Sequence, residues 1–298
     1  MKVIGKNVLI TGGASGIGKI MARICLEKGA KSVIIWDVNP TNLDNTLIEL
    51  GAVKPLVKGA AQGHLHTYQV NVTDNNAITS TYQKVKSEVG DVDILINCAG
   101  VVRGNNTFDK QTVQDINLTM DVNATAPMLV ALQILPDMLS RNSGHICNIA
   151  SAAGMLGMPK LSIYCASKWA VIGWTESMRV ELKQARSKVK VTTVAPYFIN
   201  TGMFDGVSSK IFPILKPEKT AAKIIKGIEK GKSFAGIPFS YHFIRTCQAL
   251  LPNVLFDYFF GEIFGIYSVM DHFTGRKPRP EQNASDQKQL WKKHQLSA

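Results

Sequence analysis

Three residues near the middle of the chain could together move a proton: Ser151, Tyr164 and Lys168. Tyr164 and Lys168 are four residues apart, so on a helix they share one face. A free tyrosine has a pKa of about 10, and a lysine cation one helical turn away favours the phenolate and lowers that pKa. Such a tyrosine can take a proton from an alcohol or return one to a carbonyl oxygen. Ser151 could hold the same oxygen.

A glycine-rich turn near the start of the chain could hold a second reactant. The stretch Thr11-Gly12-Gly13-Ala14-Ser15-Gly16-Ile17-Gly18 follows an apolar run at 8–10 and precedes apolar residues at helical spacing. Backbone N–H groups at a strand-to-helix turn can bind a diphosphate, and glycine lets a ligand approach the backbone. The spacing Gly-x3-Gly-x-Gly differs from the commonest dinucleotide fingerprint, Gly-x-Gly-x-x-Gly. A loop turned only for packing therefore remains an alternative.

A carboxylate ends the next apolar run, 32–37. Asp37 lies 19 residues beyond Gly18, close to the spacing expected of an acid that binds the adenosine ribose. A carboxylate accepts hydrogen bonds from both ribose hydroxyls and repels a 2′-phosphate, so Asp37 favours NAD over NADP. The alternative is a solvated aspartate at a strand end.

Strands and helices alternate along the chain, and this order must position the candidate residues. We expect strands at 8–10, 32–37, 64–72, 92–97, 145–150 and 189–194, and helices after Gly18 and at 41–51, 75–89, 125–141 and 161–185. Thr73 or Asp74 could cap the third helix, Pro127 fits a first turn, and Pro136 should kink its helix. The alternation predicts an α/β fold with a single Rossmann-like, doubly wound parallel sheet and helices on both faces. Ligands bind such sheets beyond the carboxyl ends of the strands.

The charge and cysteine content of the chain argue against several classes of protein. The 298 residues carry 34 Lys and Arg against 22 Asp and Glu, but the basic residues are scattered, apart from an excess after residue 275. No nucleic-acid-binding motif accompanies this charge, so we expect no nucleic-acid partner. Five scattered cysteines without Cys-x-x-Cys predict reduced thiols in a cytoplasmic protein. The first strand begins so close to Met1 that we expect no signal peptide or N-terminal anchor.

The end of the chain has a different composition. The stretch 234–267 holds ten of the 23 aromatic residues and only three charged ones, without an uncharged run long enough to span a bilayer. We expect an apolar helical region at about 234–273, with Pro252 splitting it into two short helices. The predicted organisation is one domain over 1–274 and a polar, basic tail over 275–298.

The combined pattern resembles the short-chain dehydrogenase/reductase family. The matching residues, which lie in the first 201, are Thr11-Gly12-x3-Gly16-Ile17-Gly18, Asn97-x-Ala99-Gly100, Asn123, Ser151, Tyr164-x3-Lys168 and Pro196 to Thr201. By this resemblance, Tyr164 is the general acid/base, Lys168 lowers its pKa and binds the nicotinamide ribose, and Ser151 orients the substrate oxygen. Asn123 would support a water-linked proton relay behind Lys168.

The resemblance also implies a nicotinamide cofactor, NAD rather than NADP given Asp37, and no metal. The residues expected to bind it are Gly12, Ser15, Gly16, Ile17, Gly18, Asp37, Asn71, Val72, Asn97, Ala99, Gly100, Tyr164, Lys168, Pro196, Ile199 and Thr201. Asn71 stands where the family often has an aspartate near the adenine, and its amide can still form hydrogen bonds.

Two longer stretches, 34–39 and 195–204, resemble the branch of the family that contains epidermal retinol dehydrogenase 2 and the 17β-hydroxysteroid dehydrogenases 11 and 13. This branch implies a hydride transfer between NAD(H) and a hydrophobic alcohol, ketone or aldehyde, retinol-like or steroid-like. Animal members of the branch have an N-terminal hydrophobic anchor, which is not expected here. Members of the family are commonly homo-oligomers.

An apolar segment at 202–214 follows Thr201 and could close over a bound ligand. We expect it to form, together with 234–267, the wall of a hydrophobic tunnel leading to Tyr164. The residues expected to contact the substrate are Ser151, Tyr197, Met203, Phe204 and Phe212.

Other functions stay open at this point. An NADPH-favouring carbonyl reductase would use the same residues, although Asp37 argues against it. A non-catalytic dinucleotide-sensing protein could have the same fold, although such proteins often lack the Tyr or the Lys. The stretch 234–267 could be a substrate lid, a dimer face or a surface in peripheral contact with a membrane.

Overall fold

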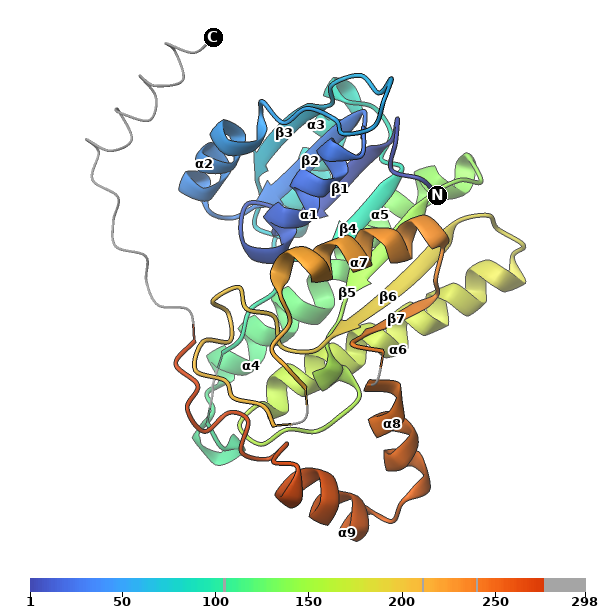
Figure 1. Ribbon diagram of the computed structural model, residues 1–298. Coiled ribbons are helices and arrows are strands. Elements are labelled where there is room, and N and C mark those ends of the chain that lie inside the picture. Colours follow the sequence, from blue (N-terminus) through green and yellow to red (C-terminus); the bar gives the residue numbers. More distant parts are fainter. Residues whose placement is uncertain (104–105, 211, 240, 276–298) are drawn as a thin grey trace, which may run out of the picture.

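Seven parallel strands form one sheet at the centre of the molecule (Figure 1). The computed structural model describes residues 1–103, 106–210, 212–239 and 241–275, so the expected basic tail, apart from Gly275, lies outside the described residues. The strands, in the spatial order β3-β2-β1-β4-β5-β6-β7, are β1 (Asn7–Thr11), β2 (Ser32–Asp37), β3 (His64–Gln69), β4 (Ile94–Asn97), β5 (His145–Ile149), β6 (Lys190–Pro196) and β7 (Phe234–Ile237). The doubly wound parallel sheet predicted from the sequence is confirmed.

Helices cover both faces of this sheet (Figure 1). One face carries α1 (Gly16–Glu27), α2 (Pro40–Leu50) and α7 (Pro217–Lys230), and the other carries α3 (Asn75–Glu88), α5 (Ala126–Ser140) and α6 (Ser162–Gln184). α4 (Val113–Met120) runs into α5 through a π-helical turn, Asp121–Thr125. α8 (Tyr241–Leu250), α9 (Asn253–Phe256) and a second π-helical turn, Asp257–Ile263, stand out beyond the carboxyl end of the sheet (Figure 1).

Period-two alternation in the strands produces the two layers of core. In β1, Val8 and Ile10 pack toward α1 and α7, whereas Leu9 packs toward α3 and α5. Because side chains alternate across a strand and both faces are covered, the central positions of β1, Val8 to Ile10, are all apolar, as is usual in parallel sheets. A third apolar cluster lies beyond the carboxyl end of the sheet and joins residues 152–165, 195–198 and 256–270.

The strand order reverses next to β1, since β2 pairs with one edge of this strand and β4 with the other. A crevice opens at such a switch point beyond the carboxyl ends of the strands. The Thr11 hydroxyl accepts hydrogen bonds from the backbone N–H groups of Cys98 and Ala99, at 3.1 and 3.2 Å. This contact fixes the end of β4 beside the glycine-rich turn.

Local signals in the sequence predicted several element ends. Asp74 caps α3 by accepting hydrogen bonds from two backbone N–H groups, and Pro127 lies in the first turn of α5. Pro252 separates α8 from α9 as expected. The predicted helical region 234–273 is wrong at its start, because Phe234–Ile237 pairs with β6 as the edge strand β7. α4 and α7 were not predicted.

Within the described residues, the combined helix Val113–Ser140 is the one segment long and apolar enough to cross a membrane by length and composition. Ala126, Val130, Ile134 and Met138 follow one another at helical spacing along α5 and pack against the sheet. The α5 part of the segment therefore has the packing of a core helix.

Candidate active site

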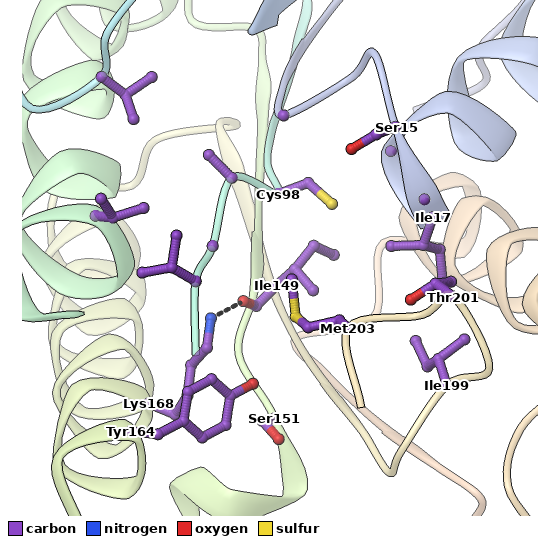
Figure 2. A pocket seen from close by; sticks show the side chains of 18 of the residues that line it. Ser15, Ile17, Cys98, Ile149, Ser151, Tyr164, Lys168, Ile199, Thr201 and Met203 are labelled. Atoms are coloured by element: carbon purple, nitrogen blue, oxygen red, sulfur yellow. Dashed lines mark hydrogen bonds between the residues drawn. The ribbon is translucent and has the colours of Figure 1, made fainter. Parts of the chain in front are cut away.

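A cavity of about 630 Å³ opens beyond the carboxyl ends of β1, β2, β4, β5 and β6. Its volume lies in the range that cofactor and substrate sites usually have. Ser15 and Ile17 of the glycine-rich turn line one part of it, and Ser151, Tyr164 and Lys168 line another (Figure 2). Asp37 is also among the lining residues. The topology thus brings together residues that are more than 100 positions apart in sequence.

The three residues that could move a proton come from two neighbouring elements. Tyr164 and Lys168 lie on one face of the first turns of α6, and Ser151 directly follows β5. The Lys168 ammonium donates a hydrogen bond to the backbone carbonyl of Ile149 at 3.0 Å and lies 5.7 Å from the centre of the Tyr164 ring. Figure 2 shows the hydroxyl groups of Tyr164 and Ser151 on the same side of the cavity. A substrate oxygen between them would meet a proton donor or acceptor and a second hydrogen-bonding hydroxyl.

Burial dominates the ionisation of these groups. It raises the pKa of Tyr164 above its ordinary value, and the hydrogen bond with Ser151 offsets part of that rise. Burial also lowers the pKa of Lys168 to about 8. The lowering of the Tyr164 pKa expected from Lys168 is therefore not present in this structure, because desolvation of the phenolate outweighs the hydrogen bond with Ser151. At neutral pH the Tyr164 hydroxyl holds its proton.

Asn123 lies behind Lys168 rather than in the cavity wall. It sits in the π-helical turn Asp121–Thr125, where its amide accepts from the Val101 N–H at 2.8 Å and donates to the Val101 carbonyl at 2.9 Å. The same amide donates to the Ser167 hydroxyl at 3.2 Å. Asn123 thus ties the loop after β4 to α6 next to Lys168, a position from which it could support a proton relay.

The glycine-rich turn has the shape of a dinucleotide cradle. Gly12 has φ = +65°, and a Cβ there would lie 2.8 Å from the Ala99 Cα, while a Cβ on Gly18 would lie 2.2 Å from the Gly12 carbonyl oxygen. Among the described residues, the Ser15 side chain makes no capping hydrogen bond to α1. The first turn of α1, Gly16 to Gly18, lines the cavity, so its N–H groups can receive a diphosphate.

Asp37 lies where an adenosine ribose could meet it. Its two carboxylate oxygens accept hydrogen bonds from the backbone N–H groups of Ala14 and Asn39, at 3.2 and 3.1 Å. Each oxygen keeps a further lone pair for a ribose hydroxyl. The residues around the cavity therefore fit a nicotinamide dinucleotide, with the ribose acid at one end and Tyr164 at the other.

The structure brings most of the predicted site residues to the cavity wall. Those that line it are Gly12, Ser15, Gly16, Ile17, Gly18, Asp37, Asn71, Val72, Ala99, Gly100, Ser151, Tyr164, Lys168, Pro196, Tyr197, Ile199, Thr201, Met203 and Phe204. Asn97, Asn123 and Phe212 are not among the lining residues. Asn97 turns into the core, where its amide donates to Asn148 at 2.8 Å and to the Pro127 carbonyl at 3.3 Å. Phe212 packs against the ring of Tyr197.

The wall near Tyr164 is apolar. The Phe204 ring meets the Tyr164 ring edge to face, with centroids 5.7 Å apart, and Met203 and Tyr197 line the same region. Seventeen other lining residues were not predicted as site residues, among them Arg103, Leu118, Val122 and Met158. Leu118 and Val122 have the i, i+4 spacing of one helix face. This signal was missed because no helix was predicted at α4. Arg103 and Met158 carry no local signal.

Comparisons with known proteins agree with this geometry. The family model described as short chain dehydrogenase matches residues 6–211. Epidermal retinol dehydrogenase 2 of Mus musculus is 36% identical over 282 residues, which are 93% of this chain and 88% of that protein. Estradiol 17-beta-dehydrogenase 11 of Homo sapiens is 37% identical over 252 residues, 84% of this chain and 81% of that protein.

The fold is also that of solved members of this family. A short chain dehydrogenase/reductase from Burkholderia phymatum, solved in complex with NAD, superposes with a TM-score of 0.73 at 23% identity. The match covers 85% of this chain and 97% of that one. With the family model spanning more than half of the residues and relatives above 35% identity along most of their length, this chain belongs to the short-chain dehydrogenase family of NAD(P)-dependent oxidoreductases.

Proposed function

We propose that this protein transfers a hydride between NAD(H) and a hydrophobic alcohol or carbonyl compound, retinol-like or steroid-like. One observation carries the proposal: Tyr164 and Ser151 lie in a cavity whose walls change from a dinucleotide cradle at Gly12 to apolar side chains at Met203 and Phe204. The names of the relatives, a retinol dehydrogenase and an estradiol dehydrogenase, support the substrate class.

Each polar residue then has one task. Tyr164 gives its proton to a carbonyl oxygen or takes one from an alcohol, and Ser151 holds that oxygen. Lys168 binds the nicotinamide ribose, and Asn123 keeps the loop and helix around Lys168 in place. When bound, NAD⁺ supplies the hydride acceptor, and its cationic ring favours the phenolate of Tyr164. The apolar wall excludes water from the reacting carbon.

A panel of alcohols tests the substrate class. We expect retinol and steroid alcohols to give a larger kcat/KM than short alcohols, measured by the absorbance of reduced nicotinamide. The apolar wall at Met203 and Phe204 gains contacts only with the longer molecules. Preference for a small polar alcohol would refute the proposal.

We propose NAD rather than NADP as the cofactor, because the Asp37 carboxylate would repel a 2′-phosphate. NAD should be preferred at least about tenfold in kcat/KM, which corresponds to about 1.4 kcal/mol of transition-state binding. Asp37→Ala should shrink this ratio, whereas Asp44→Ala, which removes an equal charge from the exposed side of α2, should leave it unchanged. Equal use of both cofactors by the wild type would refute the assignment.

We also propose that the protein forms a homo-oligomer. Leu132 and Leu139 lie two turns apart on α5 and are 65% and 43% exposed, and Val180 on α6 is 49% exposed. Apolar side chains along exposed helices support association with a second copy. Light scattering after size exclusion should give a mass of at least twice 32.6 kDa, and a monomer at micromolar concentration would contradict the proposal.

A further inference from the structure

The last described stretch of the chain, residues 266–275, returns from the C-terminal helices to the outside of the cavity wall, and we call it the strap. Figure 1 shows it, in red, beside the loop between β6 and α7. Within that loop, the 202–208 segment carries Met203 and Phe204, which line the cavity. None of the strap residues, all of which the structure describes, lines the cavity itself. Any effect of the strap on a substrate must therefore pass through the 202–208 loop.

Hydrogen bonds join the strap to the 202–208 loop at two places. The carbonyl of Asp205 accepts hydrogen bonds from the N–H groups of Thr274 and Gly275, at 2.8 and 3.2 Å, and from the Thr274 hydroxyl at 3.2 Å. The N–H of Ser208 donates to the Val269 carbonyl at 3.3 Å. Because the two contacts are separated along both segments, the strap restricts rotation of the loop as well as its translation.

Gly206 permits this close approach. Its φ is +85°, and a Cβ at this position would lie 1.9 Å from the His272 carbonyl oxygen and 2.8 Å from the Thr274 nitrogen. Glycine adopts this conformation readily and leaves the space that the strap backbone occupies. A larger residue at Gly206 would therefore displace the strap, the loop or both.

Aromatic rings carry the contact from the strap to Tyr164. The Phe204 ring contacts the Tyr164 ring and the Phe273 ring of the strap, with centroid distances of 5.7 and 6.3 Å. Val269 and Met270 of the strap are buried in the same apolar cluster as Tyr164. Since packed interiors leave little free space, a displacement of one member is passed to its neighbours. A shift of the strap should thus move Phe204 relative to Tyr164.

An ion pair connects the strap to a second loop of the cavity wall. Asp271 is paired with Lys160 at 2.8 Å. Lys160 precedes α6 and lies two residues beyond Met158, which lines the cavity. The two side chains are 49% and 34% exposed, so the pair contributes little stability and can open readily. The strap is therefore held firmly to the 202–208 loop and weakly to the loop before α6.

We propose that the strap sets the substrate specificity of the cavity, with Gly206 and Asp271 as positioning residues that keep Phe204 against Tyr164. The part that concerns the substrate rests on the proposed function, because a long apolar molecule needs the wall at Phe204 whereas a short one does not. The part that concerns the loop rests on the hydrogen bonds, the ring contacts and the ion pair alone.

Hydrogen exchange of the full chain without ligand, followed by mass spectrometry, tests the part that concerns the loop. Asp271→Asn removes the ion pair, so exchange in both the strap and the 202–208 loop should become about two- to fivefold faster, the range that an exposed ion pair provides. Glu49→Gln is the matched control, because it removes the Lys19–Glu49 pair, which is 2.6 Å long and involves an exposed side chain of α2. This control should leave exchange in both segments unchanged.

A glycine pair gives a second and stronger perturbation. Gly206→Ala should accelerate exchange in both segments more than Asp271→Asn does, because the added Cβ collides with the strap backbone. Gly59→Ala is its control, since Gly59 has φ = +80° and no atom within 4 Å of an added Cβ, so it introduces the same backbone strain without the collision. If the strap exchanges faster while the loop does not, or if neither segment changes in either variant, the proposal is overturned.

Kinetics with long and short alcohols test the part that concerns the substrate. Asp271→Asn should raise KM for a long apolar alcohol about two- to fivefold with kcat near that of the wild type, and should leave both constants unchanged for a short alcohol. Lys160→Asp with Asp271→Lys restores an ion pair of reversed polarity, and aspartate tolerates the φ of +65° at Lys160. This double variant should recover the wild-type KM and exchange rates.

The two readouts distinguish this proposal from the proposed function. Equal losses with both alcohols and no recovery in the double variant would indicate general destabilisation and would overturn the positioning role. An unchanged KM for the long alcohol in both Asp271→Asn and Gly206→Ala would overturn the specificity role. A wild type that oxidises no apolar alcohol, although its exchange responds as expected, would overturn the proposed function alone.

Discussion

Replacing Tyr164 by phenylalanine removes one oxygen from the site and leaves the ring in place. In the proposed function this hydroxyl exchanges a proton with the substrate oxygen, and the Ser151 hydroxyl lies on the same side of the cavity (Figure 2). Losing general acid/base catalysis costs at least about 10²-fold in kcat. This factor corresponds to about 2.7 kcal/mol in the activation barrier.

The stability of this variant should change little. Tyr164→Phe loses one hydrogen bond, to Ser151, which contributes about 1 kcal/mol. The Ser151 hydroxyl still accepts the N–H of Ala153 at 3.2 Å, and its own proton can turn toward the cavity that Ser151 lines. Thermal unfolding should therefore shift by only a few degrees, and NAD affinity, measured by calorimetric titration, should stay near the wild-type value.

Tyr197→Phe is the matched control. Tyr197 lines the same cavity and its hydroxyl also has a serine partner, Ser209, at 2.9 Å. This variant should keep kcat near that of the wild type, in the same assay of nicotinamide absorbance. The assignment of Tyr164 fails if Tyr164→Phe keeps more than about a tenth of the activity, or if Tyr197→Phe loses as much.

Three further changes test the site. Burial lowers the pKa of Lys168 to about 8, against about 10.4 in an unfolded chain. Between these pH values the unfolded state binds one proton more than the folded state, so the free energy of unfolding rises with pH. From pH 7 to pH 9, urea unfolding should show the wild type gaining about 1 kcal/mol relative to Lys168→Met, and an equal pH dependence of the two proteins would contradict this. Gly18→Ala places a Cβ 2.2 Å from the Gly12 carbonyl oxygen, so it should cost about 1–3 kcal/mol of stability and weaken NAD binding, and an unchanged Kd would count against the cradle. Phe204→Ala should raise KM for long apolar alcohols more than for short ones, and Phe212→Ala, behind Tyr197, should do so less; equal effects would mean that Phe204 does not contact the substrate.

The sequence predicted the elements that have strong local signals. Buried strands such as 32–37 consist of apolar runs, and Asp74 and Pro252 mark helix ends through side-chain or ring chemistry. β7 was missed because its four residues, Phe-Ala-Gly-Ile, are short and need β6 beside them to form a strand. Its existence depends on tertiary pairing, which the local sequence does not report.

In the candidate site, too, some features follow from the local sequence and others depend on tertiary neighbours. The glycine turn, Asp37 and the Tyr164–Lys168 pair have a spacing that defines their positions, and all four reach the cavity. The direction of the Asn97 side chain depends on its neighbour Asn148, which comes from a strand 51 residues away. Likewise, the raised pKa of Tyr164 comes from burial by several segments, so the Lys168 spacing alone could not predict it.

The π-helical turn Asp121–Thr125 determines where this chain can change its length. Such a turn holds one residue more than an α-helical turn does. Deleting Val122 would therefore restore a regular α-helical turn and leave the rotation of α4 relative to α5 unchanged. A deletion elsewhere in 113–130 would rotate α4 relative to α5 by about 100°, so that either Asn123 would leave Val101 and Ser167, or Ile134 and Met138 would leave the sheet. In a library of single-codon deletions, survivors within 113–130 should thus be confined to the turn 121–125, and survivors should be frequent in the exposed loop at 54–62.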